Sequence, residues 1–581
     1  MYLKQNKVGN RIHLIIAHGY RDKETKQTRT KTIKTIGYVD ELLKEYPDPI
    51  AHFKEVARQM TKEENSKRKV TLTIDMNESL AEDMDNRKNL GYAAILKMYY
   101  ELKLDQYFNN NARNHDFEFS PNAIMTLLVI SRLLSPGSKL KAFEEKDRYF
   151  ERFDFSLADI YRALTYFASL EFDVQRHINE QITAFYGVRN TKTIYYDVTN
   201  YYFEIDQEDD LRKRGHSKEN HRGPIVQMGL AMDGDGIPLH YELFPGNAPD
   251  TSTFRSVIGE VRRKYDTGRI VVVADMGIIS GDNIYYLIGG EKKDKTLNGY
   301  VLSFSVRGGS EEFKKYVLDS DGYRGKDGKP IKDDTEFMIK SRIIAREINV
   351  TMDSGKKVKK IVYEKQLVFW GKKYADKAKA DREKVILKAK TLVDDPAKYK
   401  NATAYGAAKY VKNIEFDKET GEVITTGKAL LFDEVKLSEE EMFDGYYSIV
   451  TSEKEMSDED IIDTYRGLWE IEETFRITKG TLEARPVYLS RPERISSHFL
   501  ICFIALVIIR LLQKQTGRQF SSDEIIACLN RISCSHEQEN IYLFDYRSKI
   551  SDTIGKALGI ELDKKRMLLS EIKNIVAVSK K

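Results

Sequence analysis

The sequence predicts a mixed α/β protein, and a few stretches in its middle carry this prediction. Thr193–Thr199 and Ile225–Met232 are rich in β-branched and aromatic residues, and Pro238–Phe244 follows an Asp-Gly-Asp-Gly turn, as in a β-hairpin. An amphipathic helix is expected over residues 252–265, ahead of the apolar strand Arg269–Asp275. A hairpin, a helix and a buried strand in this order are typical of the start of a ribonuclease-H-like fold.

The segments around this core predict further domains, because 581 residues exceed what one hydrophobic core can hold. Helical periodicity recurs between residues 86 and 188, and an apolar helix is expected over residues 495–512. Strand-like pieces are spread over a charged stretch between the two parts of the core. The expected units are a basic N-terminal β/helix unit (1–80), a helical domain (81–190), the first part of the core (191–307), an inserted, mainly β domain (308–455), the second part of the core (456–515) and a helical C-terminal region (516–581).

The charge distribution is more informative than the net charge of +4. Residues 1–37 contain nine Lys and Arg against two acidic residues, and residues 355–390 contain thirteen against four. Two separate basic segments indicate a polyanionic partner, although solvated basic faces give the same pattern.

Several protein classes are excluded by composition. The three cysteines have no zinc-site spacing, and their small number fits a reducing cytosol. The longest apolar run, residues 499–509, is too short to span a bilayer and is followed by Arg510. The polar, basic N-terminus is unlike a signal peptide, and the chain contains no GxxxxGK[ST] loop for ATP-driven work.

Two of the predicted strands end in a carboxylate, Asp197 in Tyr-Tyr-Asp-Val-Thr and Asp275 in Val-Val-Ala-Asp-Met-Gly. Functional groups of open α/β sheets collect near strand ends. An aspartate in this position also caps turns and helices, and for either residue alone the two interpretations are equally good.

A third carboxylate lies on a predicted helix over residues 465–479. Tyr465, Glu472 and Lys479 are seven residues apart, so they share one helix face, and Arg476 joins it four residues after Glu472. Two strand aspartates and a helix glutamate that converge at one sheet edge suit Mg²⁺ or Mn²⁺. Two such ions about 3.5–4 Å apart support phosphoryl transfer on a phosphodiester.

These residues form part of a longer motif. Tyr465, Glu472 and Lys479 have the spacing of a Tyr-x2-Arg-x3-Glu-x6-Lys signature, although Leu468 occupies its arginine position. The chain thereby resembles the DDE transposases of bacterial insertion sequences, in the insertion-sequence-four-like group. The resemblance covers residues 190 to 510 and extends over Trp469-Glu-Ile-Glu-Glu, Gly215–Lys218, Gln227–Gly229, Gly236–Pro238, Phe244–Asn247, Asp250, Arg485-Pro486 and His498.

The resemblance implies roles for the residues at the matching positions. Asp197, Asp275 and Glu472 would be the catalytic, metal-binding triad, while Tyr465, Arg476 and Lys479 would contact phosphates of the transposon end. With Leu468 in the arginine position, Arg466 and Arg476 are possible substitutes. The alternative for Arg476 and Lys479 is simple surface pairing with Glu472 and Glu473.

Two further sites are candidates for DNA contact. Trp370 lies beside cations in Val368–Lys373, and an aromatic face can stack an unpaired base, as a tryptophan of this insertion does in some relatives. Packing inside the insertion is the alternative for Trp370. The basic loop Arg212–Lys218 suits contacts near the active site, through Arg212 and Lys218, or is an ordinary solvated loop.

The predicted function is that of a transposase. With Mg²⁺ or Mn²⁺ it would hydrolyse DNA at the transposon ends and join the freed 3′-hydroxyl to target DNA. Its partners would be the terminal inverted repeats, target DNA and a second copy of the chain, in the cytoplasm at the nucleoid. A stand-alone metal-dependent nuclease and a non-catalytic DNA-binding protein derived from a transposase are the alternatives.

Overall fold

The computed structural model describes most of the chain. The described residues are 1–21, 27–66, 77, 79, 82, 85–205, 207–215, 223–265, 267–278, 280–289, 297–325, 328–329, 331, 336–352, 354–394, 407–412, 415–416, 423–424 and 431–581. They divide into two units, Met1–Asp85 and Asn86–Lys581, and each unit is described by itself.

The N-terminal unit is a three-stranded antiparallel sheet with a helix packed on it. Leu14, Ile16 and Ala17 of β2 and Ala57 of α2 form its buried core. The amino group of Met1 donates to the Thr61 hydroxyl at 2.7 Å, which ties the first strand to the last helix. The elements of this unit are β1 (Tyr2–Val8), β2 (Arg11–Arg21), β3 (Thr28–Tyr38), α1 (Val39–Leu42) and α2 (Pro49–Ser66).

The second unit contains a helical body that is assembled from both ends of its sequence. Six helices precede the sheet, namely α3 (Tyr92–Glu101), α4 (Leu104–Ala112), α5 (Pro121–Leu134), α6 (Lys139–Glu144), α7 (Leu157–Ser169) and α8 (Glu171–Tyr186). Four follow it, namely α16 (Pro492–Gln515), α17 (Ser522–Arg531), α18 (Lys549–Leu558) and α19 (Leu569–Ser579). Four short antiparallel strands join the two groups, in the order β19 (Arg566–Leu568), β18 (Ile541–Phe544), β17 (Ser533–Gln538) and β4 (Arg87–Asn89).

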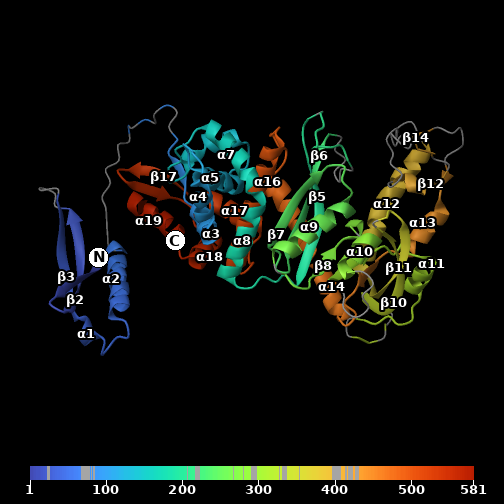
Figure 1. Cartoon of the computed structure of the whole chain (residues 1–581), viewed down its shortest axis with the longest axis horizontal. Coiled ribbons are helices and arrows are strands. Elements are labelled where there is room, and N and C mark those ends of the chain that lie inside the picture. The colour runs from blue at the N-terminus through green and yellow to red at the C-terminus, as the bar shows by residue number, and fades with distance from the viewer. Residues whose placement is uncertain are drawn as a thin grey trace. The chain divides into compact units, whose positions relative to one another are not determined.

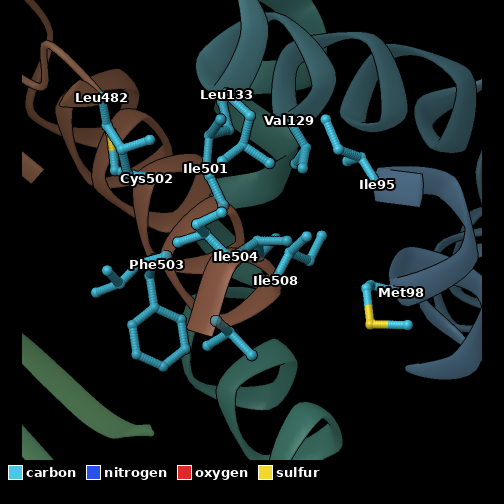
Figure 2. Close-up of a cluster of buried hydrophobic side chains, with 14 of the residues drawn as sticks. Ile95, Met98, Val129, Leu133, Leu482, Ile501, Cys502, Phe503, Ile504 and Ile508 are labelled. Carbon is cyan, nitrogen blue, oxygen red and sulfur yellow. The ribbon is translucent and has the colours of Figure 1, made fainter. Parts of the chain in front are cut away.

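Helix α16 is the centre of this helical body. Its Ile501, Ile504 and Ile508 point among the side chains of α3 and α5, as Figure 2 shows. Phe503 packs on Tyr241, a residue of the central sheet, with ring centroids 5.0 Å apart. The expectation that residues 456–515 belong wholly to the core therefore needs correction, because an all-round apolar helix is most stable where other helices surround it.

Helix α16 is long and apolar enough to cross a membrane, and it is the single such helix in the described part of the chain. Within the structure 94% of its apolar window is buried, as in the core helix of a globular protein. The C-terminal region also differs from the expected all-helical one, because β17, β18 and β19 lie among its helices.

The central sheet has eight strands in the order β10-β11-β16-β9-β8-β5-β6-β7. Strand β5 pairs antiparallel with β6 and parallel with β8, and β8 pairs parallel with β9. This arrangement agrees with the predicted ribonuclease-H-like core (Figure 1). The core strands are β5 (Thr193–Tyr202), β6 (Ile225–Asp233), β7 (Pro238–Pro245), β8 (Val271–Ala274) and β9 (Gly299–Phe304).

Helices cover both faces of this sheet. On one face α9 (Asp250–Lys264) and α10 (Gly281–Ile288) bury the even-numbered residues of β5 in a core of their own. On the other face α14 (Asp458–Arg466) packs on β8, β9 and β16, and α15 (Trp469–Arg476) packs on β5. The odd-numbered residues of β5, which include Asp197, belong to this second face, as do the odd-numbered residues of β8, and Asp275 follows directly after β8 in the same alternation.

In the residues that the structure describes, the segment 308–455 is not a separate, mainly β domain. Its strands β10 (Phe337–Thr351), β11 (Lys357–Gly371) and β16 (Tyr446–Thr451) extend the core sheet beyond β9, because the outer edge of β9 offers unpaired backbone groups. The remaining elements are largely helical, namely α11 (Glu311–Leu318), α12 (Lys372–Asp394) and α13 (Glu434–Glu441), with two-residue strands β12 (Val411–Lys412), β13 (Glu415–Phe416), β14 (Val423–Ile424) and β15 (Leu431–Phe432).

Candidate active site on β5 and at the end of β8

Asp197 and Asp275 lie at the same level on neighbouring strands. Strands β5 and β8 run parallel, with Tyr195 opposite Val273. Two residues further along each strand come Asp197, within β5, and Asp275, directly after the end of β8. Neighbouring strands are about 4.8 Å apart, and residues two apart leave the same face, so both side chains start side by side on one face of the sheet.

The Asp275 carboxylate is oriented by three donors. The Ser303 hydroxyl on β9 donates to Oδ1 at 2.6 Å, and the Met276 N–H donates to the same atom at 2.7 Å. The Tyr465 hydroxyl on α14 reaches it at 3.5 Å. In the described part of the chain these hydrogen bonds all end on Oδ1, which leaves Oδ2 for a ligand.

Tyr195 of β5 fixes the position of the helical segment above the sheet. Its hydroxyl donates to the Thr464 carbonyl at 3.2 Å, at the end of α14. The next turn contains Gly467, and a Cβ there would fall on the Tyr195 ring and hydroxyl. The absence of a side chain at Gly467 therefore lets the segment lie directly on the strand that carries Asp197.

The prediction of one helix over residues 465–479 is wrong. The chain forms α14, a tight turn at Gly467 and Leu468, α15, and then a π-helix over Ile477–Thr481. In the turn the Leu468 N–H donates to the Tyr465 carbonyl at 3.0 Å, a spacing of three residues that breaks the four-residue ladder. Tyr465, Glu472 and Lys479 thus belong to three successive elements, and each element positions one of them.

Glu472 is exposed on α15 and lies within electrostatic range of the aspartate site. Burial raises the pKa of the Tyr465 phenol to about 12, and the negative charges of Asp275 and Glu472 both add to this rise. Two carboxylates that act on one hydroxyl must both be close to it. Glu472 is therefore related to Asp275 electrostatically, since the charges of both act on Tyr465.

The donor set at this edge fits a hard divalent cation. Asp197, Asp275 and Glu472 offer carboxylate oxygens, which Mg²⁺ and Mn²⁺ prefer. Among the described residues, no three His, Cys, Asp or Glu side chains are gathered closely enough to form a metal-binding group. Negative charges repel one another, so a cation between these carboxylates would favour a closer arrangement of them.

Lys479 lies on the same face of the sheet as Asp197. Its ammonium group is 5.9 Å from the ring centroid of Tyr201, which is four residues beyond Asp197 on β5. Lys479 belongs to the π-helix, an element that is frequent at functional sites. The predicted cation therefore lies along the strand that carries the first aspartate.

Arg476 has surface partners. Its guanidinium pairs with Asp523 of α17 at 3.0 Å and with Glu473 at 3.6 Å. Leu468, in the arginine position of the signature, is buried and 7% exposed, so its side chain contributes to the core. Arg466 pairs with Asp463 on its own helix at 3.2 Å.

The chain segment after the π-helix is anchored in the helical body. Arg132 of α5 donates to the Leu482 and Glu483 carbonyls, at 3.1 Å each. His498 of α16 bonds through Nε2 to the Ala484 carbonyl at 3.0 Å, and its Nδ1 contacts the Lys139 ammonium nitrogen at 3.2 Å. A neutral His498 that donates from Nε2 and accepts at Nδ1 satisfies both contacts.

The buried Lys139 makes stability depend on pH. Burial, together with the charge of Arg132, lowers the pKa of Lys139 to about 7. Between pH 7 and its unfolded pKa near 10.5 the unfolded chain binds a proton here that the folded protein lacks, so stability rises with pH. Relative to Lys139→Met, the wild type should gain about 2 kcal/mol of unfolding free energy from pH 7 to 9.

Thermal unfolding midpoints of the two proteins at pH 7 and pH 9, measured by calorimetry, check this prediction. Lys141→Met is the matched control, because Lys141 is an exposed residue of the same helix. If stability depends on pH to the same extent in the wild type and in Lys139→Met, the group whose titration changes stability is not Lys139.

Trp370 and Arg212 take part in the fold. Trp370 is half-buried in β11, on the sheet face opposite to Asp275, and its indole N–H donates to the Asp444 carbonyl at 2.9 Å. Arg212 pairs with Asp209 at 2.6 Å and donates to the Ser490 carbonyl at 2.9 Å. Lys218, the other predicted DNA contact of this loop, lies outside the described residues.

Sequence reasoning missed two exposed tyrosines at the same sheet edge. Tyr447 of β16 and Tyr374 of α12 lie with ring centroids 4.9 Å apart, and Tyr447 also stacks on Phe369. Tyr447 lies on the face that carries Ser303, as its strand register shows. A run of aromatic residues across β11 and β16 is a signal that could have indicated them.

Two protein families match the chain. Residues 199–508 match the family described as Transposase DDE domain, and this match includes Asp275 and Glu472 and begins two residues after Asp197. Residues 3–70 match the family described as IS1634 family transposase, N-terminal domain. No curated protein matches the chain.

Proposed function

The chain belongs to the Transposase DDE domain family, which more than half of its residues match, and we propose that this protein is an insertion-sequence transposase that cuts the ends of its element and joins them to target DNA. The observation that carries this proposal is the pair of aspartates on adjacent parallel strands, with the segment that bears Glu472 docked over them through Tyr465. The spacing of Tyr465, Glu472 and Lys479 supports membership of the insertion-sequence-four-like group.

Asp197, Asp275 and Glu472 would hold Mg²⁺ or Mn²⁺. When bound, these ions activate the attacking oxygen and stabilise the charge that develops on the leaving oxygen of a phosphodiester. The contacts of Ser303, Met276 and Tyr465 keep one oxygen of Asp275 engaged and direct the other toward the ligand.

The reaction proceeds in two displacements at phosphorus. In the first, water attacks the phosphodiester at the transposon end, the P–O bond to the 3′-oxygen breaks, and the 3′-hydroxyl takes up a proton. In the second, this 3′-hydroxyl attacks a target phosphodiester, loses its proton and displaces a target 3′-oxygen. Each step forms one P–O bond and breaks another, so no energy source is required.

Tyr465 serves this chemistry as a hydrogen-bond donor. Its pKa is raised to about 12, so the phenol stays protonated near neutral pH and can donate to Asp275. Lys479 would neutralise a phosphate next to the cleaved bond.

The N-terminal unit and the helical body are proposed to recognise the terminal repeats. Strand β3 exposes Arg29, Lys31 and Lys34 to solvent, which suits backbone phosphates. By family resemblance the active complex would be a dimer that bridges two ends, at the bacterial nucleoid.

The exposed Tyr447 and Tyr374 are better placed than Trp370 to stack an unpaired base near Asp275.

Strand transfer tests this function against the alternatives. The purified protein with Mg²⁺ is expected to cleave a duplex that carries the element's own end, and to join a pre-cut end with a free 3′-hydroxyl to a supercoiled plasmid. Cleavage without joining would favour a stand-alone nuclease. Transposition in cells that is unchanged by Asp197→Asn would favour a non-catalytic DNA-binding protein.

A further inference from the structure

A basic pocket lies in the helical body, outside the eight-stranded sheet. It has a volume of about 430 Å³, which falls within the range of ~300–1,000 Å³ typical of ligand sites. We call it the Arg531 pocket, and its walls are Arg87, Lys88, Asn89, Arg148, Asn530, Arg531, Ser533, Asp545 and Tyr546. None of these residues belongs to the predicted active site.

Positive charge exceeds negative charge in the Arg531 pocket. Arg87, Lys88, Arg148 and Arg531 face a single carboxylate in the wall, that of Asp545. Asp545 pairs with Arg87 at 3.2 Å, and both side chains are more than half exposed, so solvent weakens this pair. Arg148 pairs with Glu145, outside the wall, at 3.0 Å. Lys88 and Arg531 are therefore the surplus cations that remain for an anionic ligand.

Arg531 is held in a way that leaves its donors available. Its guanidinium carbon lies 4.1 Å from the ring centroid of Tyr546, a cation–π contact that uses none of its N–H donors for a hydrogen bond. Lys88 donates to the Asp147 carbonyl at 2.6 Å, a neutral acceptor that preserves its charge. Guanidinium groups presented in this manner match the geometry of phosphate oxygens.

Helix capping does not explain this concentration of cations. Arg531 ends α17, but the Asn89 side chain donates to the last carbonyls of that helix, to Leu529 at 2.9 Å and to Asn530 at 3.1 Å. Strand β4, which carries Arg87 and Lys88, is fixed by pairing with β17. The pocket is thus a rigid surface built from three distant parts of the sequence.

We propose that the Arg531 pocket binds a backbone phosphate of duplex DNA, as a contact separate from the Asp197–Asp275 edge. The proposal rests on the proposed transposase function, which supplies the DNA. The walls are cationic, and a contact to a backbone phosphate strengthens binding without selecting a sequence. It also links the helical body to the DNA whose ends are cut at the sheet.

The test compares full-length wild type, Arg531→Gln and Arg87→Gln/Arg531→Gln in binding to a fluorescent duplex at several salt concentrations. Arg531→Gln should weaken binding about 3- to 10-fold and lower the slope of log K against log salt by about 1. Arg176→Gln is the control, since this exposed arginine of α8 pairs with carboxylates of its own helix. Thermal midpoints equal to that of the wild type establish that the variants are folded.

Affinity and salt slope that match those of the wild type in both pocket variants would overturn the proposal. Stabilisation by inorganic phosphate that is lost in Arg531→Gln, with unchanged DNA affinity, would assign the pocket to a small anion and would also overturn it. Binding is measured without Mg²⁺, so it is separate from the chemistry. A protein that binds the duplex with the predicted salt slope but never cleaves it would refute the proposed function and leave the pocket proposal intact.

Discussion

Asp275→Asn and Glu472→Gln should each lower the rate of end cleavage by about 10³-fold, which corresponds to about 4 kcal/mol of lost transition-state stabilisation. Each change removes a negative charge from the proposed metal-binding set and leaves the size of the side chain unchanged. The amide introduced by Asp275→Asn would retain an oxygen that can accept from Ser303 and Tyr465, so the fold should persist. Single-turnover cleavage of an end duplex with Mg²⁺ gives the rates.

Asp463→Asn is the matched control for these two variants. Asp463 lies on α14 one residue before the helix's contact with β5, it is 74% exposed, and its charge pairs with Arg466. Wild-type cleavage by Glu472→Gln would remove Glu472 from the proposed triad. If Asp463→Asn also lost cleavage, the general negative charge of α14, and not Asp275 and Glu472 in particular, would be what cleavage requires.

Gly467→Ala should reduce cleavage about 10²-fold, because misplacement of catalytic groups by about 1 Å has effects of this size. The added methyl group would fall on the Tyr195 ring and hydroxyl, and this contact determines how closely α14 and α15 approach β5. Forcing an extra methyl into a packed contact costs about 1–3 kcal/mol, which should lower the unfolding temperature without abolishing the fold. Cleavage rate and calorimetric midpoint are measured together.

Gly480→Ala separates this effect from a general effect of glycine replacement. Gly480 lies in the π-helix next to Lys479, and a Cβ there would meet nothing within 4 Å. We expect near-normal cleavage from this variant. If Gly467→Ala cleaves as fast as Gly480→Ala, the close approach to Tyr195 is not what positions the site.

Local patterns predicted individual elements well. The helical periodicity predicted between residues 86 and 188 includes α5, where Ser120 caps the helix and Pro121 occupies its first position, signals that lie within the sequence itself. The strands that carry Asp197 and lead to Asp275 are confirmed for a similar reason, since runs of β-branched and aromatic residues specify buried strands.

Contacts between distant residues could not be predicted in this way. Ser303 looks ordinary in its strand, and it becomes important because β9 lies beside β8 and brings its hydroxyl to Asp275. Gly467 looked like a helix interior position, and its role depends on Tyr195, which lies 272 residues earlier in the sequence. Trp370 matched a base-stacking pattern, but strand pairing placed its indole on the other face of the sheet.

The sequence by itself therefore determined the strands of the core and the family, and it proposed the carboxylates, because these depend on residue identity and on spacing within one segment. The tertiary structure decided how the sheet continues into residues 337–371, how the segment 465–479 divides into three elements, and which side chains meet at Asp275. Such features arise from packing between segments that are far apart along the chain, and a local pattern carries no information about which distant surface a residue will meet.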